Sequence, residues 1–513
     1  MKERQEMIEC VRLFGMIAQM EKLNVILKAF DGDPLDKKYP LERAFKNIPL
    51  GTCISVCDKK EGLPVLNAEE HIWLPAPPFR EGRYSDEELN ACAPIDEALI
   101  EKMRHYEAVF MDMVDRYANK MEKFLVSGDV PYAERKRIYY ANLRYWNHVL
   151  DSKKIDVVLM NHEPHQCYDY VLYGLCKVKN IPILYLARIF TIDTSFVVTD
   201  WEDPAPELRE ALLRLREEYR DPNKPVELSK NYEANFNLFR NKQPNPWYKP
   251  KKVNLTPQSF VSRWWKQALK IIRRDPRRFL TSMFSQEFWS RKLRQHKAIG
   301  FYDQHIRVPD LSKPFIYIAL HYQPEATTLP LAGAYAEQER IIQLLAHYLP
   351  PRVAIYVKEH PAQSERWRSE AFYQSLLAIP SVTFIPRTTD TYELVDRCLA
   401  VATATGSVGF EAVMRQKPVL MFGHFVYQYA PGVHRIRTAA DCEQAIKQIM
   451  SQKESHSIHD VRMFLKALER CSTPFPGPPD SPFEEYTQEQ KSELVGALFE
   501  KKILAAVSER SGA

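Results

Sequence analysis

Long apolar runs are missing from this sequence of 513 residues. No uninterrupted apolar stretch reaches the length of about 18 residues that a membrane-spanning helix requires. Residues 1–6, MKERQE, also lack the apolar core of a secretory signal peptide. We therefore expect a cytoplasmic protein that has no spanning helix.

Paired cysteines are missing too. The nine cysteines are scattered, their number is odd, and no two of them stand in a Cys-x-x-Cys spacing. Close cysteine pairs are typical of structural zinc sites, and an even number of cysteines is typical of a disulfide framework. The pattern favours reduced, mostly buried thiols, and it argues against structural zinc and against a disulfide-stapled fold.

The sequence also has no evident internal repeats. Hydrophobic residues make up 45% of the chain and aromatic residues 12%, which is typical of a globular protein. A chain of 513 residues is too long for one hydrophobic core, so we expect two to three domains.

What the sequence does contain is a recurring order of strand, loop and helix between residues 315 and 425. Short runs rich in apolar, β-branched and aromatic residues predict the strands, and apolar residues at helical spacing separate them. The predicted strands are residues 315–320, 353–357, 382–385, 399–403 and 418–422. This alternation predicts an α/β domain with a parallel sheet covered on both faces.

The loop after the fourth of these strands has the composition of an anion site. Gly406 and Gly409 allow close approach to the backbone, and Ser407 stands where a helix is predicted to begin. Helix amides and the positive end of the helix dipole favour a bound anion there. Glu411, one turn inside the helix, would accept hydrogen bonds from a ribose. The alternative is that Ser407 is an N-cap and Glu411 a solvated helix residue.

The loop after the second strand is also polar. Lys358, Glu359 and His360 follow a buried strand, and Pro361 fixes the turn. His360 can donate a hydrogen bond to a phosphate oxygen. The alternative is a structural histidine, which is the more common situation for a lone histidine after a strand.

The loop after the first strand adds amide, carboxylate and hydroxyl groups in Gln323, Glu325, Thr327 and Thr328. An Ω-type loop stabilised by its own polar contacts is the alternative. Because ligands of such sheets bind at the carboxyl ends of the strands, three polar loops at one edge favour a ligand site.

Four segments carry a resemblance to a known family: residues 320–328 (LHYQPEATT), 356–361 (YVKEHP), 403–412 (TATGSVGFEA) and 417–423 (KPVLMFG). They resemble the bacterial capsule polysaccharide biosynthesis family, which groups with two-domain, GT-B-like glycosyltransferases. Some of those transferases use CMP-activated sugar acids. The resemblance covers residues 315–438 well, and the N-terminal half matches only in general layout.

The resemblance implies an α/β, GT-B-like fold with two Rossmann-type domains facing a cleft. It places the nucleotide in the C-terminal half, with His360 and Pro361 near the phosphates. The helix start at Thr405, Gly406 and Ser407 is also placed at phosphate, and Glu411 at the ribose. It implies no cofactor and no metal ion.

The N-terminal half is expected to open with an amphipathic helix over residues 7–17 and a strand over 24–27. GT-B halves usually open with a strand, so either the chain departs from that pattern or it begins downstream of the true start. Asp31-Gly-Asp33 resembles a metal-binding pair, but an Asp-Gly before Pro34 is ordinary turn chemistry.

A second α/β unit follows, with strands at 155–160 and 181–186. His162, Glu163 and His165 lie at the end of its first strand. They are a metal cluster, a general base with its partners, or a plain loop, and metal is the least favoured because the helical i, i+4 spacing is missing. We predict that Glu163 is the catalytic carboxylate on the acceptor side, oriented by His162 or His165. The alternative is that Glu163 caps the following helix.

Residues 239–300 are strongly basic. The segment contains sixteen Lys or Arg residues and only two acidic residues, Asp275 and Glu287. Its net charge is therefore +14 (16 − 2), in a chain whose total net charge is +5. The aromatic residues interleaved with these cations include Trp247, Trp264, Trp265, Phe279, Phe284, Phe288 and Trp289. An anionic membrane surface and a solvated connector between domains are both compatible with this composition. Nucleic acid is not expected, because no recognised motif accompanies the charge.

The C-terminal part contains a helix from about 438 to 450, a Pro-rich break at 474–482 and a last helix at about 487–507 that is expected to cross back onto the N-terminal domain. The expected division is an N-terminal Rossmann-like acceptor domain (1–220), a basic helical connector (221–312), a nucleotide-binding Rossmann-like domain (313–470) and a C-terminal segment (471–513).

The expected function is a metal-independent glycosyltransferase of capsule or surface polysaccharide assembly. Its partners would be a nucleotide-sugar donor, with a CMP-activated sugar as one candidate, a glycan or lipid-linked acceptor, and an anionic membrane surface on the inner face of the cytoplasmic membrane. A teichoic-acid-type phosphotransferase or polymerase and a non-catalytic binding subunit of a capsule export assembly are the alternatives.

Overall fold

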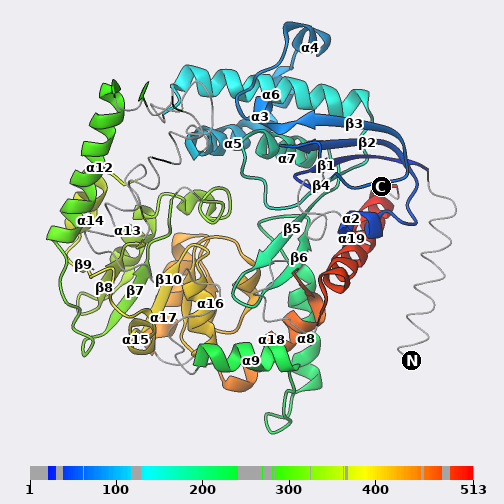
Figure 1. The fold of residues 1–513 in the computed structure, drawn as a ribbon. Helices are drawn as coiled ribbons and strands as arrows, with labels where there is room; N and C mark the ends of the chain where they lie inside the picture. The colour runs from blue at the N-terminus through cyan, green and yellow to red at the C-terminus, as the bar shows by residue number, and fades with distance from the viewer. Residues whose placement is uncertain are drawn as a thin grey trace. The chain divides into compact units, whose positions relative to one another are not determined.

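The computed structural model describes residues 21–30, 39–61, 63–116, 129–240, 269, 276, 280–281, 284–323, 325–361, 363, 368–451, 456–475 and 486–511. The helix predicted at 7–17, the Asp31–Asp33 pair, the Pro-rich residues 476–482 and most of the basic segment 239–300 lie outside these residues. The chain divides into two compact units (Figure 1). Unit 1 is formed within Met1–Tyr117, Pro131–Ala205 and Cys471–Ala513, and unit 2 within Ala118–Val130 and Pro206–Arg470.

Unit 1 contains a sheet of seven strands in the order β13-β6-β5-β4-β1-β2-β3. The strands are β1 (Leu23–Lys28), β2 (Leu50–Cys57), β3 (Ala68–Pro75), β4 (Val157–Met160), β5 (Ile183–Ile189), β6 (Thr194–Val198) and β13 (Thr473–Pro474). The first five are parallel, and β6 and β13 are antiparallel to their neighbours. The strand order reverses between β1 and β4, so the ends of these two strands form the switch point where ligands of such sheets bind.

The helices of unit 1 are α2 (Tyr39–Ala44), α3 (Ala76–Arg80), α4 (Asp86–Ala91), α5 (Glu97–Met113), α6 (Tyr132–Ser152), α7 (Tyr168–Val178) and α19 (Gln488–Ser511). The C-terminal helix α19 buries Val495, Phe499 and Ile503 in the same core as β1. Its Glu493 and Glu500 accept hydrogen bonds from Arg43 of α2 at 2.5 and 2.7 Å. The last helix therefore crosses back onto the N-terminal part of the chain, as the sequence predicted.

Unit 2 contains a sheet of six strands in the order β12-β11-β10-β7-β8-β9, all parallel. The strands are β7 (Phe315–Ala319), β8 (Ala354–Lys358), β9 (Val382–Phe384), β10 (Ala400–Thr403), β11 (Val419–Met421) and β12 (Val433–Arg435). All five strands predicted between residues 315 and 425 are present. The switch point of this sheet lies between β7 and β10, whose following loops hold the polar residues discussed above.

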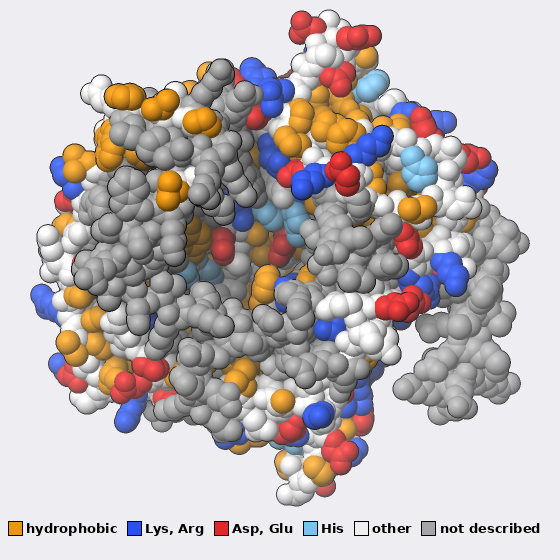
Figure 2. All heavy atoms as spheres, viewed as in Figure 1, with side chains coloured by type: hydrophobic (Ala, Val, Ile, Leu, Met, Phe, Trp, Pro, Cys, Tyr) orange, Lys and Arg blue, Asp and Glu red, His pale blue; other side chains and the backbone are white. Residues whose placement is uncertain are grey.

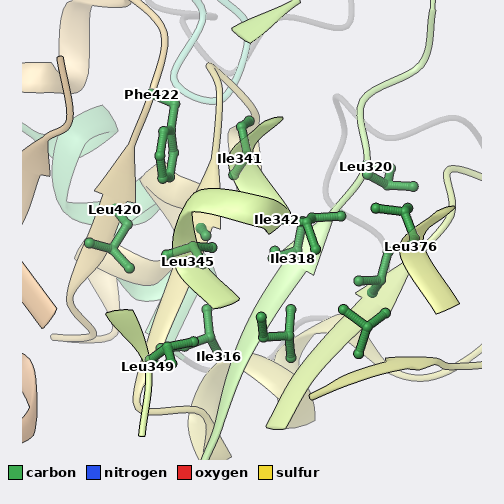
Figure 3. Packing of buried hydrophobic residues seen from close by; sticks show 14 of the residues in the cluster. Ile316, Ile318, Leu320, Ile341, Ile342, Leu345, Leu349, Leu376, Leu420 and Phe422 are labelled. Carbon is green, nitrogen blue, oxygen red and sulfur yellow. The ribbon is translucent and has the colours of Figure 1, made fainter. Parts of the chain in front are cut away.

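The helices of unit 2 are α8 (Pro206–Glu218), α9 (Lys230–Arg240), α12 (Gln286–Gln304), η3 (Gly333–Tyr335), α13 (Glu339–Tyr348), α14 (Glu370–Leu377), α15 (Thr391–Arg397), α16 (Ser407–Met414), η4 (Val426–Tyr429), α17 (Ala439–Ser451) and α18 (Ile458–Cys471). The core of unit 2 lies where α13 covers the sheet. Figure 3 shows Ile342 and Leu345 of α13 packed near Ile316 and Ile318 of β7.

The predicted fold class is confirmed, because each unit has a sheet with the strand order of a Rossmann-type domain. None of the described helices is long and apolar enough to span a bilayer. Figure 2 shows hydrophobic side chains at the surface in the region where Figure 1 draws α12. Phe284, Trp289 and Leu293 are among the exposed apolar residues of this region.

Candidate functional site

The loops that follow β7 and β10 are joined by hydrogen bonds at the switch point of unit 2. The Nε2 atom of His321 lies 3.0 Å from the hydroxyl of Thr403 and accepts a hydrogen bond from the amide of Thr405 at 3.2 Å. The hydroxyl of Thr405 donates to the carbonyl oxygen of Thr327 at 2.7 Å. Thr405, predicted to bind phosphate, therefore ties the two loops together through its side chain.

His321 is a buried residue that sequence reasoning did not single out. Because its Nε2 accepts the Thr405 amide proton, the ring proton is on Nδ1. Burial lowers the pKa of His321 to about 3, and Arg368 and His360 add to the effect. A Cβ at position 406 would lie 3.2 Å from Cε1 of His321 and 2.8 Å from the Thr403 hydroxyl. The protein's own side chains thus require glycine at 406.

Helix α16 begins at Ser407, as predicted, and its N-cap is Gly406. The Thr403 hydroxyl accepts the amide of Gly406 at 3.0 Å. No group in the described part of the chain accepts a hydrogen bond from the amides of Ser407 and Val408. Two amide groups at the positive end of a helix dipole therefore lie directly beyond the switch point, which is an arrangement that favours an anion.

Glu411 lies one turn inside α16 and is only 1% exposed, with the Ser407 hydroxyl 3.5 Å from its carboxylate. The alternative in which Glu411 is a solvated helix residue is therefore wrong. Ser407 is not the N-cap, so that part of the alternative is wrong as well. The close approach at Gly409 comes from Tyr427, whose hydroxyl would lie 2.5 Å from an added Cβ.

Lys358 ends β8 and points its ammonium group at the loop between β9 and α15. The ammonium donates to the carbonyl oxygen of Thr389 at 2.6 Å and to the hydroxyl of Thr391 at 2.8 Å. The residue is only 8% exposed. Lys358 therefore contributes a fixed positive charge from within the fold.

Glu359 is fully buried and anchors the turn that follows β8. Its carboxylate accepts hydrogen bonds from Arg368 at 3.2 Å and from Tyr373 at 2.7 Å, and it accepts the amide of His360 at 2.7 Å. Arg368 also donates to the carbonyl oxygen of His321 at 3.0 Å and to the side chain of Gln323. Arg368 thus connects the loops after β7 and β8, a role that no pattern in the sequence indicated.

Gln323 and Glu325 make contacts within the protein. The Gln323 amide group donates to the carbonyl oxygen of Ala336 at 2.8 Å, and its oxygen accepts from Arg368. Glu325 is exposed, and its carboxylate accepts from Thr327 at 3.2 Å while its amide donates to the Thr328 hydroxyl at 3.3 Å. These internal contacts favour the Ω-type loop among the alternatives for this segment.

His360 is the most accessible of the predicted phosphate-binding histidine and lysine side chains. The residue is half-buried, and its ring centroid lies 5.6 Å from that of Tyr322. Burial lowers the pKa of His360, and the carboxylates of Glu359 and Glu325 oppose that shift. A neutral His360 still carries one ring N–H that can donate to a phosphate oxygen.

A second polar cluster lies at the switch point of unit 1. Lys28 ends β1, and its ammonium group lies 2.6 Å from the carboxylate of Asp169 in α7, with both side chains fully buried. The same ammonium group lies 2.9 Å from Nε2 of His162, which follows β4. Burial lowers the pKa of Lys28, and Asp169 opposes that shift. Sequence reasoning found His162 but neither Lys28 nor Asp169.

The two histidines of this cluster share one acceptor. Nδ1 of His162 and Nδ1 of His165 donate to the carbonyl oxygen of Glu163 at 2.9 and 2.6 Å, and the ring centroids are 4.5 Å apart. Burial lowers the pKa of His165 well below its usual value, and His162, Arg116 and Lys28 add to the effect. The structure therefore brings the three predicted residues together and fixes the tautomer of both rings.

The local geometry bears on two interpretations of Glu163. Helix α7 begins at Tyr168 with Cys167 at its N-cap, so the alternative in which Glu163 caps that helix is wrong. One potential ligand atom from each of His162, Glu163 and His165 lies within 4.8 Å of the others, a spacing that a metal ion requires. The absence of the i, i+4 pattern is therefore not sufficient reason to discount a metal ion here.

One part of the chain matches a known family. Residues 311–461 match the family described as capsule polysaccharide biosynthesis protein. This segment contains sheet strands β7 to β12 and the three loops of the unit 2 site. A search of curated proteins gave no match to the chain.

Solved structures resemble the chain only distantly. The β-Kdo 2,7 transferase KpsC of Thermosulfurimonas dismutans is 12% identical, with a TM-score of 0.29, over 66% of this chain and 81% of that one. The β-Kdo 2,4 transferase of the same protein is 15% identical, with a TM-score of 0.26, over 61% and 79%. The UDP-GlcNAc 2-epimerase of Methanocaldococcus jannaschii is 11% identical, with a TM-score of 0.24, over 88% and 99%.

These likenesses are too distant to support an argument about activity, so the fold rests on the topology of the two sheets and the family rests on the sequence match. The resemblance predicted from the four segments is confirmed over residues 311–461, which match the capsule polysaccharide biosynthesis family.

Proposed function

We propose that this protein is a glycosyltransferase of capsule or surface polysaccharide assembly, and that unit 2 binds its nucleotide-activated sugar donor. The observation that carries the proposal is the start of α16 at the switch point between β7 and β10. There the amides of Ser407 and Val408 supply hydrogen-bond donors, and the buried carboxylate of Glu411, one helical turn further on, supplies an acceptor. A nucleotide offers the matching pair, an anionic phosphate and a ribose with hydroxyl donors.

The departing phosphate gains negative charge during transfer, and fixed donors must stabilise that charge in a metal-independent enzyme. His360 and the two α16 amides are the donors in this proposal. Lys358, held by Thr389 and Thr391, contributes through its charge instead of through a direct hydrogen bond. Glu359 and Gln323 act by holding the loops, because their side chains are buried and bonded to Arg368.

Unit 1 supplies the acceptor side of the reaction in this proposal. Glu163 is the catalytic carboxylate that takes the proton of the attacking hydroxyl group, and its backbone is held by His162 and His165. A CMP-activated sugar is one candidate for the donor, and the acceptor is a glycan or a lipid-linked glycan.

Two alternatives remain distinct in their products. A teichoic-acid-type phosphotransferase would transfer a polyol phosphate from its nucleotide, and a binding subunit of an export assembly would release no nucleotide. Incubation with donor and lipid-linked acceptor, followed by analysis of the released nucleotide and of the product, separates all three functions.

The first test is a thermal-shift screen of the whole chain against CMP, CDP, UDP and GDP. A ligand at a hundredfold excess over its Kd stabilises the folded state by about 2.7 kcal/mol, so a specific binder should stand apart from the others. An equal response to all four nucleotides, or to none, would contradict a specific donor site.

A further inference from the structure

The cluster at the switch point of unit 1 has the geometry of a metal site, yet a cation of the protein already lies in it. His162, Glu163 and His165 place one potential ligand atom each within 4.8 Å of the others. Both rings donate Nδ1–H to the Glu163 carbonyl oxygen, which leaves Nε2 as the acceptor of each ring. Metal-binding histidines are typically held in the same way, with the second ring nitrogen bonded to a backbone carbonyl.

The position next to Nε2 of His162 is taken by Lys28. The ammonium nitrogen lies 2.9 Å from that atom, which is the distance of a direct hydrogen bond. The side-chain amide nitrogen of Gln166 lies 3.2 Å from the same Nε2 of His162. A divalent ion could bind Nε2 of His162 only if it displaced the ammonium group of Lys28 from that position.

Lys28 is fixed where it stands. Its carbonyl oxygen accepts the amide of Asn161 at 3.0 Å, and the residue is paired with Met160 across β1 and β4. Its ammonium group is 2.6 Å from Asp169, which in turn accepts the amide of Gln166 at 2.6 Å. Both partners of the ion pair are fully buried, so withdrawing Lys28 would leave an uncompensated carboxylate in the core.

We propose that Lys28 is the resident cation of the His162–Glu163–His165 cluster, and that Asp169 holds it in the place a divalent metal ion would otherwise take. The cluster then has a fixed positive charge beside the Glu163 carboxylate without binding a metal ion. This proposal deepens the proposed function, because it names the group that makes the acceptor side metal-independent, but its test needs no enzymatic activity.

The test is a titration of the whole chain with Co²⁺ after exhaustive chelation. Binding of Co²⁺ is followed by its absorption in the visible range, and competition by Zn²⁺ is measured by calorimetry. The variant Lys28→Met removes the charge and keeps the length of the side chain. Because Asp169 would then be buried without a partner, the double variant Lys28→Met with Asp169→Asn is the principal protein. His162→Ala in each background defines the part of the binding that belongs to this cluster.

In the wild type, His162→Ala should leave Co²⁺ binding unchanged. The double variant should gain a site whose affinity exceeds that of the wild type by on the order of a hundredfold, and His162→Ala should abolish the gain. Wild-type binding that depends on His162 would overturn the proposal, and this outcome can be observed even if neither variant folds. A folded double variant with no new site would overturn it as well.

The two proposals fail separately. If the wild type binds no nucleotide in the thermal-shift screen, the proposed donor site is contradicted, but the cobalt titration still tests the role of Lys28. A cobalt site in the wild type would remove the resident-cation proposal and leave the donor site standing.

Discussion

The Glu163 carboxylate is the residue on which the proposed chemistry most depends. Since Cys167 is the N-cap of α7, Glu163 has no capping role to lose, and Glu163→Gln should retain the melting temperature of the wild type. Turnover should fall roughly 10²–10⁴-fold while nucleotide affinity is kept, because a general base acts in the chemical step. Steady-state kinetics and calorimetry measure the two quantities. Near-normal turnover would move the base elsewhere, and Glu87→Gln, exposed on α4, is the control.

His321 makes stability depend on pH. Burial lowers the pKa of His321 to about 3 in the folded protein, whereas the unfolded chain takes up a proton at its ordinary value of about 6.5. Between these two values the unfolded state binds the additional proton, so the free energy of unfolding falls as the pH falls, by about 1.4 kcal/mol per pH unit below about pH 6.

The variant His321→Gln should lose this part of the slope, because glutamine does not titrate. Urea unfolding at pH 7, 6 and 5 measures the slope for both proteins. His347→Gln, exposed on α13, is the matched control and should keep the wild-type slope. An unchanged slope in His321→Gln would show that His321 is not the group responsible.

At the residue scale, a site residue could be predicted only where the local sequence around it indicated a strand end or a helix start. His360, Ser407 and Glu411 follow strands and begin a helix, so local pattern was enough. Lys28 meets His162 across 134 residues, and Arg368 meets Gln323 across 45. Such partners are brought together by the order of the strands, which the sequence pattern around either residue does not contain.

At the scale of elements, the fit of α16 against η4 can be tested at a glycine. An added Cβ at Gly409 would lie 2.5 Å from the Tyr427 hydroxyl, which is held by its bond to the carbonyl oxygen of Gly406 at 2.6 Å. Gly409→Ala should lower the free energy of unfolding by about 1–3 kcal/mol through overpacking. Gly300→Ala in α12 meets no atom within 4 Å and should raise it by about 0.5–1 kcal/mol. Urea unfolding of both variants makes the comparison, and equal effects would contradict the packing at Gly409.

The basic segment 239–300 is a second element with a test of its own. Its net charge of +14 and its interleaved aromatic residues predict salt-sensitive binding to vesicles that contain anionic lipid. Changing Arg273, Arg274, Arg277 and Arg278 to Glu should abolish cosedimentation at low salt, and binding of the wild type should weaken as salt is raised. Cosedimentation retained by the variant would favour a connector between domains.

Sequence pattern missed the buried strands β2 and β6, and it also missed two edge strands with poor alternation, β3 and β12. Strand β3 carries Glu69, Glu70 and His71 in succession at the edge of its sheet; these three residues are exposed, and no residue of the strand is fully buried. Strand β12 is only three residues long and has no buried position. Edge strands bury little side chain, and the apolar periodicity that identifies central strands is therefore weak in them.

At the scale of the whole molecule, the alternation of strands and helices was sufficient to predict an α/β unit in each half of the chain, because parallel strands require helical crossovers, and the family resemblance implied that both are Rossmann-type domains. It was not sufficient to predict strand order, which depends on where each crossover returns. Both sheets place their switch point beside the first strand of the unit, at β1 and β4 in unit 1 and at β7 and β10 in unit 2. The predicted site residues gather at these two points because of that order.

The measurement that tests the central claim most directly is a calorimetric titration of the whole chain with the nucleotide found in the thermal-shift screen, carried out on the wild type, His360→Ala and Glu411→Gln. Glutamine is used at 411 because this residue is buried, and the change removes the charge while keeping the volume. Each variant should bind roughly 1.5–3 kcal/mol more weakly, since each loses a hydrogen bond that involves a charged group. Unchanged affinity in both folded variants would contradict a donor site at the switch point of unit 2.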